Sequence, residues 1–301
     1  MTTASSLVLL TAETSIHAGA GQSVSGIDLP IQRESHTGWP CVYGSAVKGA
    51  LRAKAETRQI LSSQEIAMLF GPDVTAKSKD GDAHAGALMV GDARLLLLPV
   101  RSLNSHFKWV TCPALLERFS KDIRRLQVAI EIPALPAKMS ESAALVTEAK
   151  EGGQLFLEEY RLTPQNDPLV SSWCAVLAKL THSLSEDSLK GQLVIVHDDI
   201  FAYLSRFCTA VNPHIAIDSA TKTVRAGALW YEESLPSETV MYVALASSAS
   251  RRRNEIVSAQ VCLDLVHTQL LGITTPYLQL GGNETTGMGW CRVHILASNE
   301  Q

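Results

Sequence analysis

The chain has 301 residues, which suffices for one large domain or about two ordinary ones. With 46% hydrophobic and 19% charged residues, its composition is that of a soluble globular protein, and no apolar run approaches the roughly 20 residues of a membrane-spanning helix. A net charge of −4 argues against a generic nucleic-acid-binding protein, because such proteins are usually basic.

The cysteines and the first residues indicate the compartment. The six cysteines are scattered without a CxxC pair, which argues against a zinc ribbon or a disulfide scaffold and fits a reducing cytoplasm. The first apolar run has no basic residues before it, so we expect a strand there and no signal peptide.

Strand and helix signals alternate along the chain, which favours an α+β fold. Apolar or alternating runs predict strands, and apolar residues at helical spacing predict helices. We expect strands at residues 6–16, 87–100, 106–111, 154–162, 192–197 and 241–247, and on either side of residues 281–289. We expect helices at residues 45–58, 63–69, 114–124, 173–180, 199–207 and 255–271.

Residues 208–230 predict a β-hairpin with Asp218 and Ser219 in its turn, because the residues of each arm alternate in character. Elsewhere, Gly, Pro and polar clusters interrupt the pattern. We therefore expect a single domain over residues 1–301, with insertions at about residues 72–86 and 128–190.

The start of the first helix is a candidate phosphate site. Ser45 follows Gly44 and is placed to accept a hydrogen bond from the first backbone N–H groups of the helix. Lys48 and Arg52 share one face, four residues apart. A helix N-terminus beside two cations suits a phosphate, although a capped surface helix with solvated cations explains the same residues.

Several motifs together resemble the RAMP superfamily of CRISPR proteins, and more narrowly the backbone subunit of type III-B (Cmr) effector complexes. The first is H-x-G-x-G from His17, followed by IDLPIQRE from Ile27 and GSAVKGALR from Gly44. Further stretches fit the same subunit: DARLLLLPVRS at residues 92–102, GALWYEE at 227–233 and LGGNETTGMG at 280–289. The resemblance spans residues 5–295.

This resemblance implies a fold and an assembly. The fold would be a ferredoxin-like (RRM-like) core, called a palm, with large insertions and a protruding hairpin, called a thumb. Copies would stack head-to-tail along one CRISPR guide RNA, beside other Cmr subunits and away from any membrane, and would cut the paired single-stranded target RNA at regular intervals.

Asp28 is the main catalytic candidate. In a loop of this kind an Asp most often caps a turn. The resemblance instead implies the residue that cleaves the target, with a divalent metal, Mg²⁺ or Mn²⁺, on its carboxylate. The adjacent 2′-hydroxyl would attack the phosphate, which would leave a 2′,3′-cyclic phosphate and a 5′-hydroxyl.

The other candidates follow from the same resemblance. His17 is a second catalytic candidate, as an acid or base, although it equally suits a histidine that lines the RNA groove. The residues expected to contact guide RNA are Arg33, Gly44, Ser45, Lys48, Arg52, Gly281, Gly282, Gly287 and Gly289. The thumb residues are His214, Ile215, Ile217, Val224 and Arg225.

Two other functions remain open. In the first, the chain is a non-catalytic RNA-binding scaffold in which Asp28 only caps a turn. In the second, it is a ribonuclease that processes guide RNA through His17 without a metal. Glu232 and Glu233 follow Trp230-Tyr231, and we expect them near the active site of a neighbouring subunit. His197-Asp198-Asp199 resembles a set of metal ligands, but an Asp at a helix start is a sufficient explanation.

Overall fold

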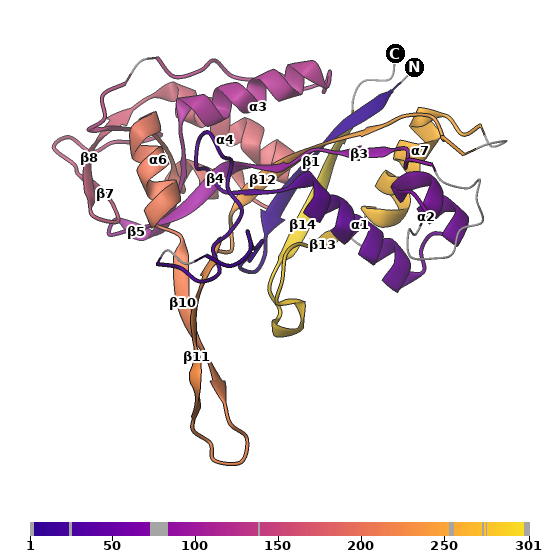
Figure 1. Cartoon of the computed structure of the whole chain (residues 1–301). Coiled ribbons are helices and arrows are strands. Elements are labelled where there is room, and N and C mark those ends of the chain that lie inside the picture. The colour runs from indigo at the N-terminus through magenta and orange to yellow at the C-terminus, as the bar shows by residue number, and fades with distance from the viewer. Residues whose placement is uncertain are drawn as a thin grey trace.

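The computed structural model describes residues 3–23, 26–72, 84–137, 139–252, 256–272, 274 and 276–297. Within this part of the chain, strands form one twelve-stranded mixed sheet and a separate two-stranded hairpin (Figure 1). The main strand order is β13-β14-β1-β12-β4-β5-β9-β6-β8-β7, with β2 paired to β4 and β3 paired to β12. The expected mixture of helices and strands is confirmed.

The sheet strands are β1 (Ala4–Ala12), β2 (Cys41–Val42), β3 (Leu88–Val90), β4 (Ala93–Ser102), β5 (Ser105–Thr111), β6 (Ala143–Val146), β7 (Leu155–Leu157), β8 (Tyr160–Asn166), β9 (Leu193–Val196), β12 (Val240–Ser247), β13 (Tyr277–Gln279) and β14 (Trp290–Ala297). The helices are α1 (Gly44–Arg58), α2 (Ser63–Phe70), α3 (Pro113–Arg125), α4 (Pro168–Thr181), α5 (Glu186–Gln192), α6 (Asp198–Phe207) and α7 (Ala259–Leu265), which continues as the π-helical turn η1 (Val266–Leu270).

Strand β1 is buried on both of its faces. Leu7 and Leu9 enter a core that also holds side chains of α3, α4 and α5. Val8 and Leu10 point to the opposite side, into a core shared with α1, α2 and α7. Burial on both faces explains why this strand reads as a continuous apolar run, because each buried aliphatic side chain contributes about 1.5–3 kcal/mol.

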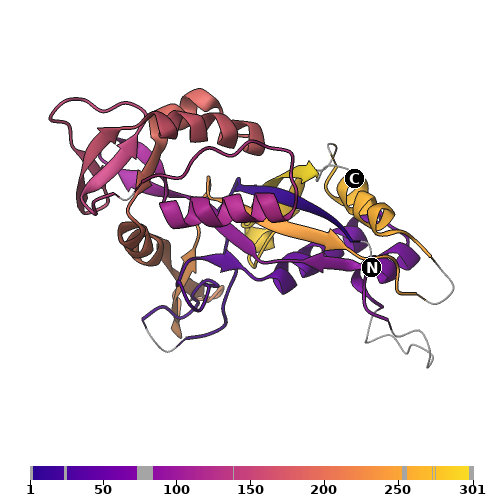
Figure 2. The ribbon, with the colours of Figure 1, turned by 90° about the horizontal axis from the view of Figure 1, so that it is seen from above.

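The helices are distributed along the sheet and over both of its faces. Helices α1, α2 and α7 gather near β13 and β14, and α6 lies toward the end that contains β5 to β9 (Figure 1). Helix α3 packs against β4, and α4 packs against β1, β9 and β14. Seen from above, the body is accordingly elongated (Figure 2). The expected insertion at residues 128–190 forms β6, β7, β8, α4 and most of α5, and it extends the main sheet. Most of the expected insertion at 72–86 lies outside the described residues.

Helix α1 begins one residue earlier than expected. Its N-cap is Tyr43, and no side chain caps it, so the expected cap by Ser45 is wrong. The reason is that the Gly44 N–H donates to Asp92 Oδ1 at 2.7 Å. A Cβ on Gly44 would lie 2.5 Å from the Val90 carbonyl oxygen, so glycine is required there for close approach to β3.

Two expected strands are divided. The strand at 154–162 is the hairpin β7–β8, because Glu158 at its turn adopts a left-handed φ of 50°. The strand at 87–100 breaks between β3 and β4 at Gly91 and Asp92, where Asp92 turns toward α1. In addition, α5, β2 and β6 were not expected.

The helix expected at 255–271 begins later and is not uniform. Ser258 is the N-cap, since its side chain accepts from the Val261 N–H. Residues 253–255 lie outside the described part, and from Val266 the helix widens into η1.

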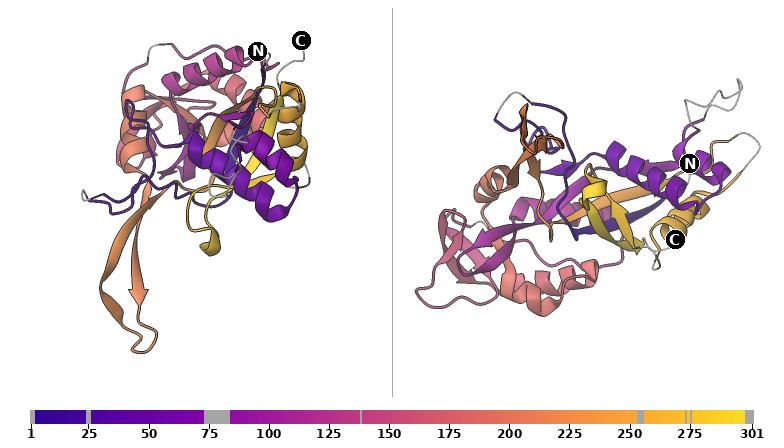
Figure 3. Two further views of the ribbon diagram at one scale, coloured as in Figure 1. Left: turned by 45° about the vertical axis from the view of Figure 1, so that its right-hand side comes forward. Right: turned by 90° about the horizontal axis from the view of Figure 1, so that it is seen from below.

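The expected hairpin consists of β10 (Ala210–Ile217) and β11 (Val224–Ser234), and it projects well away from the body (Figure 3). Its second arm runs to Ser234, beyond the expected end at residue 230. Asp218 holds the turn by accepting the N–H groups of Ala220 and Thr221, and these bonds lower the pKa of Asp218.

In the described part of the chain, no helix has both the length and the apolar character needed to cross a membrane.

A pair of glycines in α1 tests the contact between this helix and β3. Gly44→Ala should lower the free energy of unfolding by about 1–3 kcal/mol, because its Cβ overlaps Val90. Gly49→Ala, whose Cβ meets open space, should raise it by about 0.5–1 kcal/mol. Urea unfolding of both purified variants measures the difference, and equal effects would contradict the close contact.

Candidate active site at the hairpin base

Three segments that are distant in sequence meet at the base of the hairpin. The first comprises residues 17–23 and 26–33, the second is the end of β11, and the third is the glycine-rich loop between β13 and β14. Isolated bridges join Ile16 to Leu235 and Leu29 to Glu232. The Gly282 N–H donates to the His17 carbonyl at 2.9 Å. The structure therefore brings together four of the motifs singled out in the sequence.

Asp28 lies exposed at this junction, and β11 fixes its orientation. The Tyr231 N–H donates to Asp28 Oδ2 at 2.8 Å, and the Leu29 N–H donates to the Tyr231 carbonyl at 3.0 Å. A hollow of about 400 Å³ opens beside the carboxylate, lined also by Gln22, Ser23 and Trp230. One bond to Oδ2 leaves most lone pairs of the carboxylate available to a ligand.

His17 is buried beneath the same junction, with 8% of its surface exposed. Its Nδ1 lies 2.7 Å from the Glu233 carbonyl oxygen. Because a carbonyl oxygen only accepts, Nδ1 carries the proton, and the lone pair of a neutral His17 is on Nε2. That side of the ring faces Gly19, where a Cβ would lie 3.0 Å from Nε2.

Glu232 connects the histidine to the glycine-rich loop. The residue is 6% exposed, and its carboxylate lies 3.9 Å from His17 Nδ1 and accepts the Asn283 side-chain N–H at 2.5 Å. Asn283 has a left-handed φ of 60°, a conformation that Asn tolerates better than most residues. From the sequence, Glu232 was expected near a neighbouring subunit, and its contact with Asn283 was missed, because the two residues are 51 positions apart.

Arg33 is engaged within the protein. Its Nη2 donates to Glu233 Oε1 at 2.5 Å, and its Nη1 donates to the carbonyls of Gly38 and Ser205, each at 2.9 Å. The side chain is 21% exposed, and the Glu233 side chain is 2% exposed. Contact between Arg33 and RNA stays a prediction, and the arrangement shows a guanidinium already bound by protein acceptors.

The candidate residues of α1 lie apart from this junction. Lys48 Nζ donates to the Leu88 carbonyl at 2.8 Å, and burial lowers the pKa of Lys48, with further lowering by Arg251 and Arg52. Arg52 pairs with Glu56 at 2.8 Å and reaches the Gly71 carbonyl at 3.2 Å. Ser45 is exposed, and the Gly44 N–H is taken by Asp92.

The glycine-rich loop is held against the His17 segment by close backbone approach. A Cβ on Gly281 would lie 2.2 Å from the His17 carbonyl oxygen, and one on Gly289 would lie 2.1 Å from the Leu280 carbonyl oxygen. Gly282 has ordinary space, and Gly287 faces open space. Docking of the loop therefore explains Gly281 and Gly289, whereas Gly287 is explained by its left-handed φ of 84° at the end of a short turn.

The hairpin presents two different faces. On one, His214 stacks on Trp230 with ring centroids 5.5 Å apart, and Trp230 also lines the hollow beside Asp28. On the other, Ile215 is 48% exposed and is paired with Leu229, which is 55% exposed. Nearer the tip, Ile217, Val224 and Arg225 are also exposed. The aromatic face is therefore the one beside the carboxylate.

Comparison with known proteins now identifies the family. A family model described as the RAMP superfamily matches residues 9–292. The chain belongs to the RAMP superfamily. This RAMP protein is 34% identical over 294 residues to the CRISPR system Cmr endoribonuclease Cmr4 of Pyrococcus furiosus, with 96% of this chain and 95% of that protein covered.

Solved structures agree with this assignment. The crystal structure of oligomeric Cmr4 from Pyrococcus furiosus superposes with a TM-score of 0.72 at 27% identity and covers 99% of both chains. A chain in the cryo-EM structure of the type III-B Cmr-beta complex bound to cognate target RNA gives a TM-score of 0.70 at 21% identity, covering 97% of this chain and 96% of that one. At that identity the second match concerns the fold alone.

The donor set at Asp28 fits a hydrated Mg²⁺ or Mn²⁺, because Mg²⁺ commonly binds through one or two carboxylates together with water and substrate phosphates. Another group of possible ligands among the described residues comprises Glu141, His197 and Asp199, whose ligand atoms lie within 4.8 Å of one another. His197 is the N-cap of α6, and the positive end of a helix disfavours a cation. The metal expectation for this RAMP protein therefore rests on Asp28.

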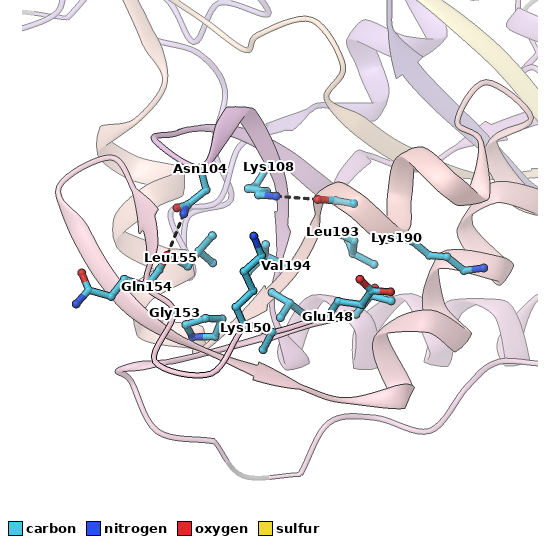
Figure 4. Close-up of a pocket in the computed structure, with 15 residues that line it drawn as sticks. Asn104, Lys108, Glu148, Lys150, Gly153, Gln154, Leu155, Lys190, Leu193 and Val194 are labelled. Carbon is cyan, nitrogen blue, oxygen red and sulfur yellow. Dashed lines mark hydrogen bonds between the residues drawn. The ribbon is translucent and has the colours of Figure 1, made fainter.

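A separate pocket of about 620 Å³ lies beside β5, β9 and α5, and it shares no lining residue with the Asp28 hollow (Figure 4). Lys108 donates to the Gly191 carbonyl at 2.7 Å near the end of α5, and burial lowers the pKa of Lys108. Lys190 pairs with Glu186 at 2.6 Å. These contacts indicate that the two lysines stabilise α5, Lys108 by a bond to its last turn and Lys190 by an ion pair within it.

The contact between Asn283 and Glu232 predicts a pH-dependent variant. Asn283→Asp keeps the shape but places a second carboxyl group against Glu232, so one of the two must keep its proton in the folded state. The unfolded chain releases that proton near pH 4, and stability should therefore fall progressively as pH rises from about 4 to 7.

Asn283→Gly is the control, since it removes the side chain and tolerates the left-handed φ. Its loss of stability should be nearly independent of pH. Thermal unfolding of both variants between pH 4.5 and 8 measures the difference, and parallel pH profiles would contradict a direct contact.

Proposed function

We propose that this RAMP protein is the repeated backbone subunit of a type III-B CRISPR complex, and that it is the endoribonuclease that cuts the target RNA. Copies of the chain would stack head-to-tail on a guide RNA, with other Cmr subunits, and each copy would cut the paired single-stranded target once. The observation that carries this proposal is the position of Asp28, an exposed carboxylate in a hollow at the base of a projecting hairpin.

The strand order supports a ferredoxin-like palm. Strands β14, β1, β12 and β4 are neighbours in that order, and each adjacent pair is antiparallel. In chain order these strands and their helices run β1-α1-β4-β12-α7-β14. A βαββαβ unit with this arrangement is ferredoxin-like. The hairpin β10–β11 is then the thumb.

The site suits cleavage by the RNA's own 2′-hydroxyl. Trp230 offers a ring on which a displaced base can stack, and unpaired RNA bases are commonly held by stacking on aromatic side chains. A strand bent there presents its phosphate to Asp28, with the 2′-oxygen in line with the leaving 5′-oxygen. The products are a 2′,3′-cyclic phosphate and a 5′-hydroxyl.

Asp28 would serve as a ligand of a divalent cation, because an exposed carboxylate is a poor general base at neutral pH. A bound Mg²⁺ or Mn²⁺ would neutralise charge that develops on the phosphate. The role of the protein is to hold the carboxylate by the Tyr231 N–H. His17 is the second catalytic candidate, with Nε2 as its proton acceptor. Because His17 is buried, support of the RNA groove from beneath is a simpler role for it than direct contact with the reacting atoms.

The acidic net charge is compatible with this assembly. Each copy of a stacked array needs only a few phosphate contacts, because the array shares one long RNA. We propose Lys48, Arg52 and the glycine-rich loop for guide-RNA contacts, and Arg225 as a residue of the thumb. The processing of guide RNA by His17 alone has less support, since His17 is 8% exposed.

One observation favours a second function, a non-catalytic scaffold. The Asp28 carboxylate already accepts the Tyr231 N–H, and a capping role requires no more than this. Asp28→Asn separates the two functions, because an amide oxygen accepts the same bond without the charge.

The test uses the assembled complex with Mg²⁺ or Mn²⁺ and end-labelled RNA complementary to the guide. With Asp28→Asn, the evenly spaced cleavage ladder should weaken by about 10²-fold or more, with target binding unchanged. A ladder that survives at the wild-type rate with intact binding would leave the chain as a scaffold.

A further inference from the structure

Glu233 is the centre of a buried polar cluster that joins three parts of the chain. Its Oε1 accepts from Arg33 Nη2 and from Thr209 Oγ1, each at 2.5 Å, and its Oε2 accepts the Ile31 N–H at 3.0 Å. Arg33 and Ile31 belong to the segment that follows Asp28. Thr209 precedes β10, and Glu233 itself is on β11.

The Arg33 guanidinium extends the cluster to the end of α6. Its Nη1 donates to the Ser205 carbonyl in α6 and to the Gly38 carbonyl in the loop before β2. A carboxylate that is 2% exposed is stable as a charge only with such partners. Both arms of the hairpin and the Asp28 segment are thus tied to one buried charge.

The backbone connects this cluster directly to Asp28. The Glu233 N–H donates to the Leu29 carbonyl at 3.0 Å, the Leu29 N–H donates to the Tyr231 carbonyl, and the Tyr231 N–H donates to Asp28 Oδ2. These bonds lay the Asp28 segment alongside β11 as a short parallel addition to the hairpin.

We propose that Arg33 and Glu233 are positioning residues, and that their ion pair makes the hairpin and the Asp28 carboxylate one rigid unit. A hairpin displaced by RNA then carries Asp28 with it, so the carboxylate keeps its place relative to the bent strand. This inference rests on the proposed ribonuclease function, and it assigns to Arg33 a role different from a contact with RNA phosphate.

The variants are Arg33→Met, which removes the charge and keeps the side-chain length, and Arg33→Lys, which keeps the charge but loses the planar set of guanidinium N–H donors. Arg94→Met is the matched control. Arg94 pairs with the buried Asp122 at 2.9 Å, in contact with the sheet and α3 and away from the hairpin. All variants are studied in the assembled complex.

The first measurement is hydrogen exchange of peptides that cover residues 26–33 and 228–234, which requires no cleavage. Arg33→Met should make both peptides exchange at least about tenfold faster, because the bonds of Leu29, Tyr231 and Glu233 then open together. Arg33→Lys should restore part of the protection, and Arg94→Met should leave both peptides unchanged. Protection that persists in Arg33→Met would overturn the proposed coupling.

The second measurement is single-turnover cleavage at saturating target, with Mn²⁺ varied. Arg33→Met should lower the rate by about 10²-fold, since displacement of a reacting group by about 1 Å has such an effect, and should raise the Mn²⁺ concentration for half-maximal rate. Target affinity should stay within about twofold. Weaker target binding with an unchanged saturated rate would instead make Arg33 an RNA ligand.

A lower thermal midpoint with an unchanged rate per complex and unchanged exchange, as expected for Arg94→Met, would reduce the Arg33 pair to a purely structural role. Failure of the proposed function has a different signature. In that case Asp28→Asn leaves cleavage intact, while the hydrogen-exchange response of Arg33→Met is still observed.

Discussion

The architecture depends on the burial of strand β1 on both faces from Ser6 to Ala12. A strand with apolar side chains on both faces must be covered on both, so the chain has to supply helices to each side of the sheet. It must also pair both edges of β1, which requires β12 on one side and β14 on the other. Because both partners come from the last quarter of the chain, the N-terminal segment after β1 lies close to the C-terminal glycine-rich loop.

The same constraint places the functional junction. The chain leaves β1 at Ala12, reaches His17 within a few residues and meets the loop that enters β14. The hairpin joins this region because β11 leads directly toward β12, the other neighbour of β1. The ends of three successive neighbours in the sheet therefore converge, and the polar cluster fills the space between them.

Local patterns were sufficient to predict most elements from the sequence. The apolar run of β1, the helical spacing of α1 and the alternating arms of the hairpin are properties of adjacent residues. The errors occur where a distant group decides the local conformation. The hydrogen bond to Asp92 determines where α1 begins. The turn between β7 and β8 has a positive φ at Glu158, a residue type that gives no sign of such a turn in the sequence.

In the candidate site too, features that depend on adjacent residues were predicted and contacts between distant residues were not. Motifs in the sequence singled out Asp28 and His17, because a resemblance to a family depends on local strings of residues. The side-chain pairs around these residues could not be predicted, since Arg33 and Glu233 are separated by 200 positions and Asn283 and Glu232 by 51. Arg33, which the sequence suggested as a contact for RNA phosphate, is in the fold the partner of the buried Glu233 carboxylate.

Because successive side chains of each hairpin strand point to opposite faces, the length of the hairpin can change in evolution only in certain ways. Each added residue pair in both arms lengthens the ribbon by about 7 Å and keeps the His214 and Trp230 side in its orientation. An odd insertion would turn every residue beyond it to the opposite side. Related chains can therefore adopt longer or shorter ribbons in even steps, or in odd steps at a bulge such as the register shift between Ile215 and Ile217. The reach of the projection and the composition of the junction can thus vary independently.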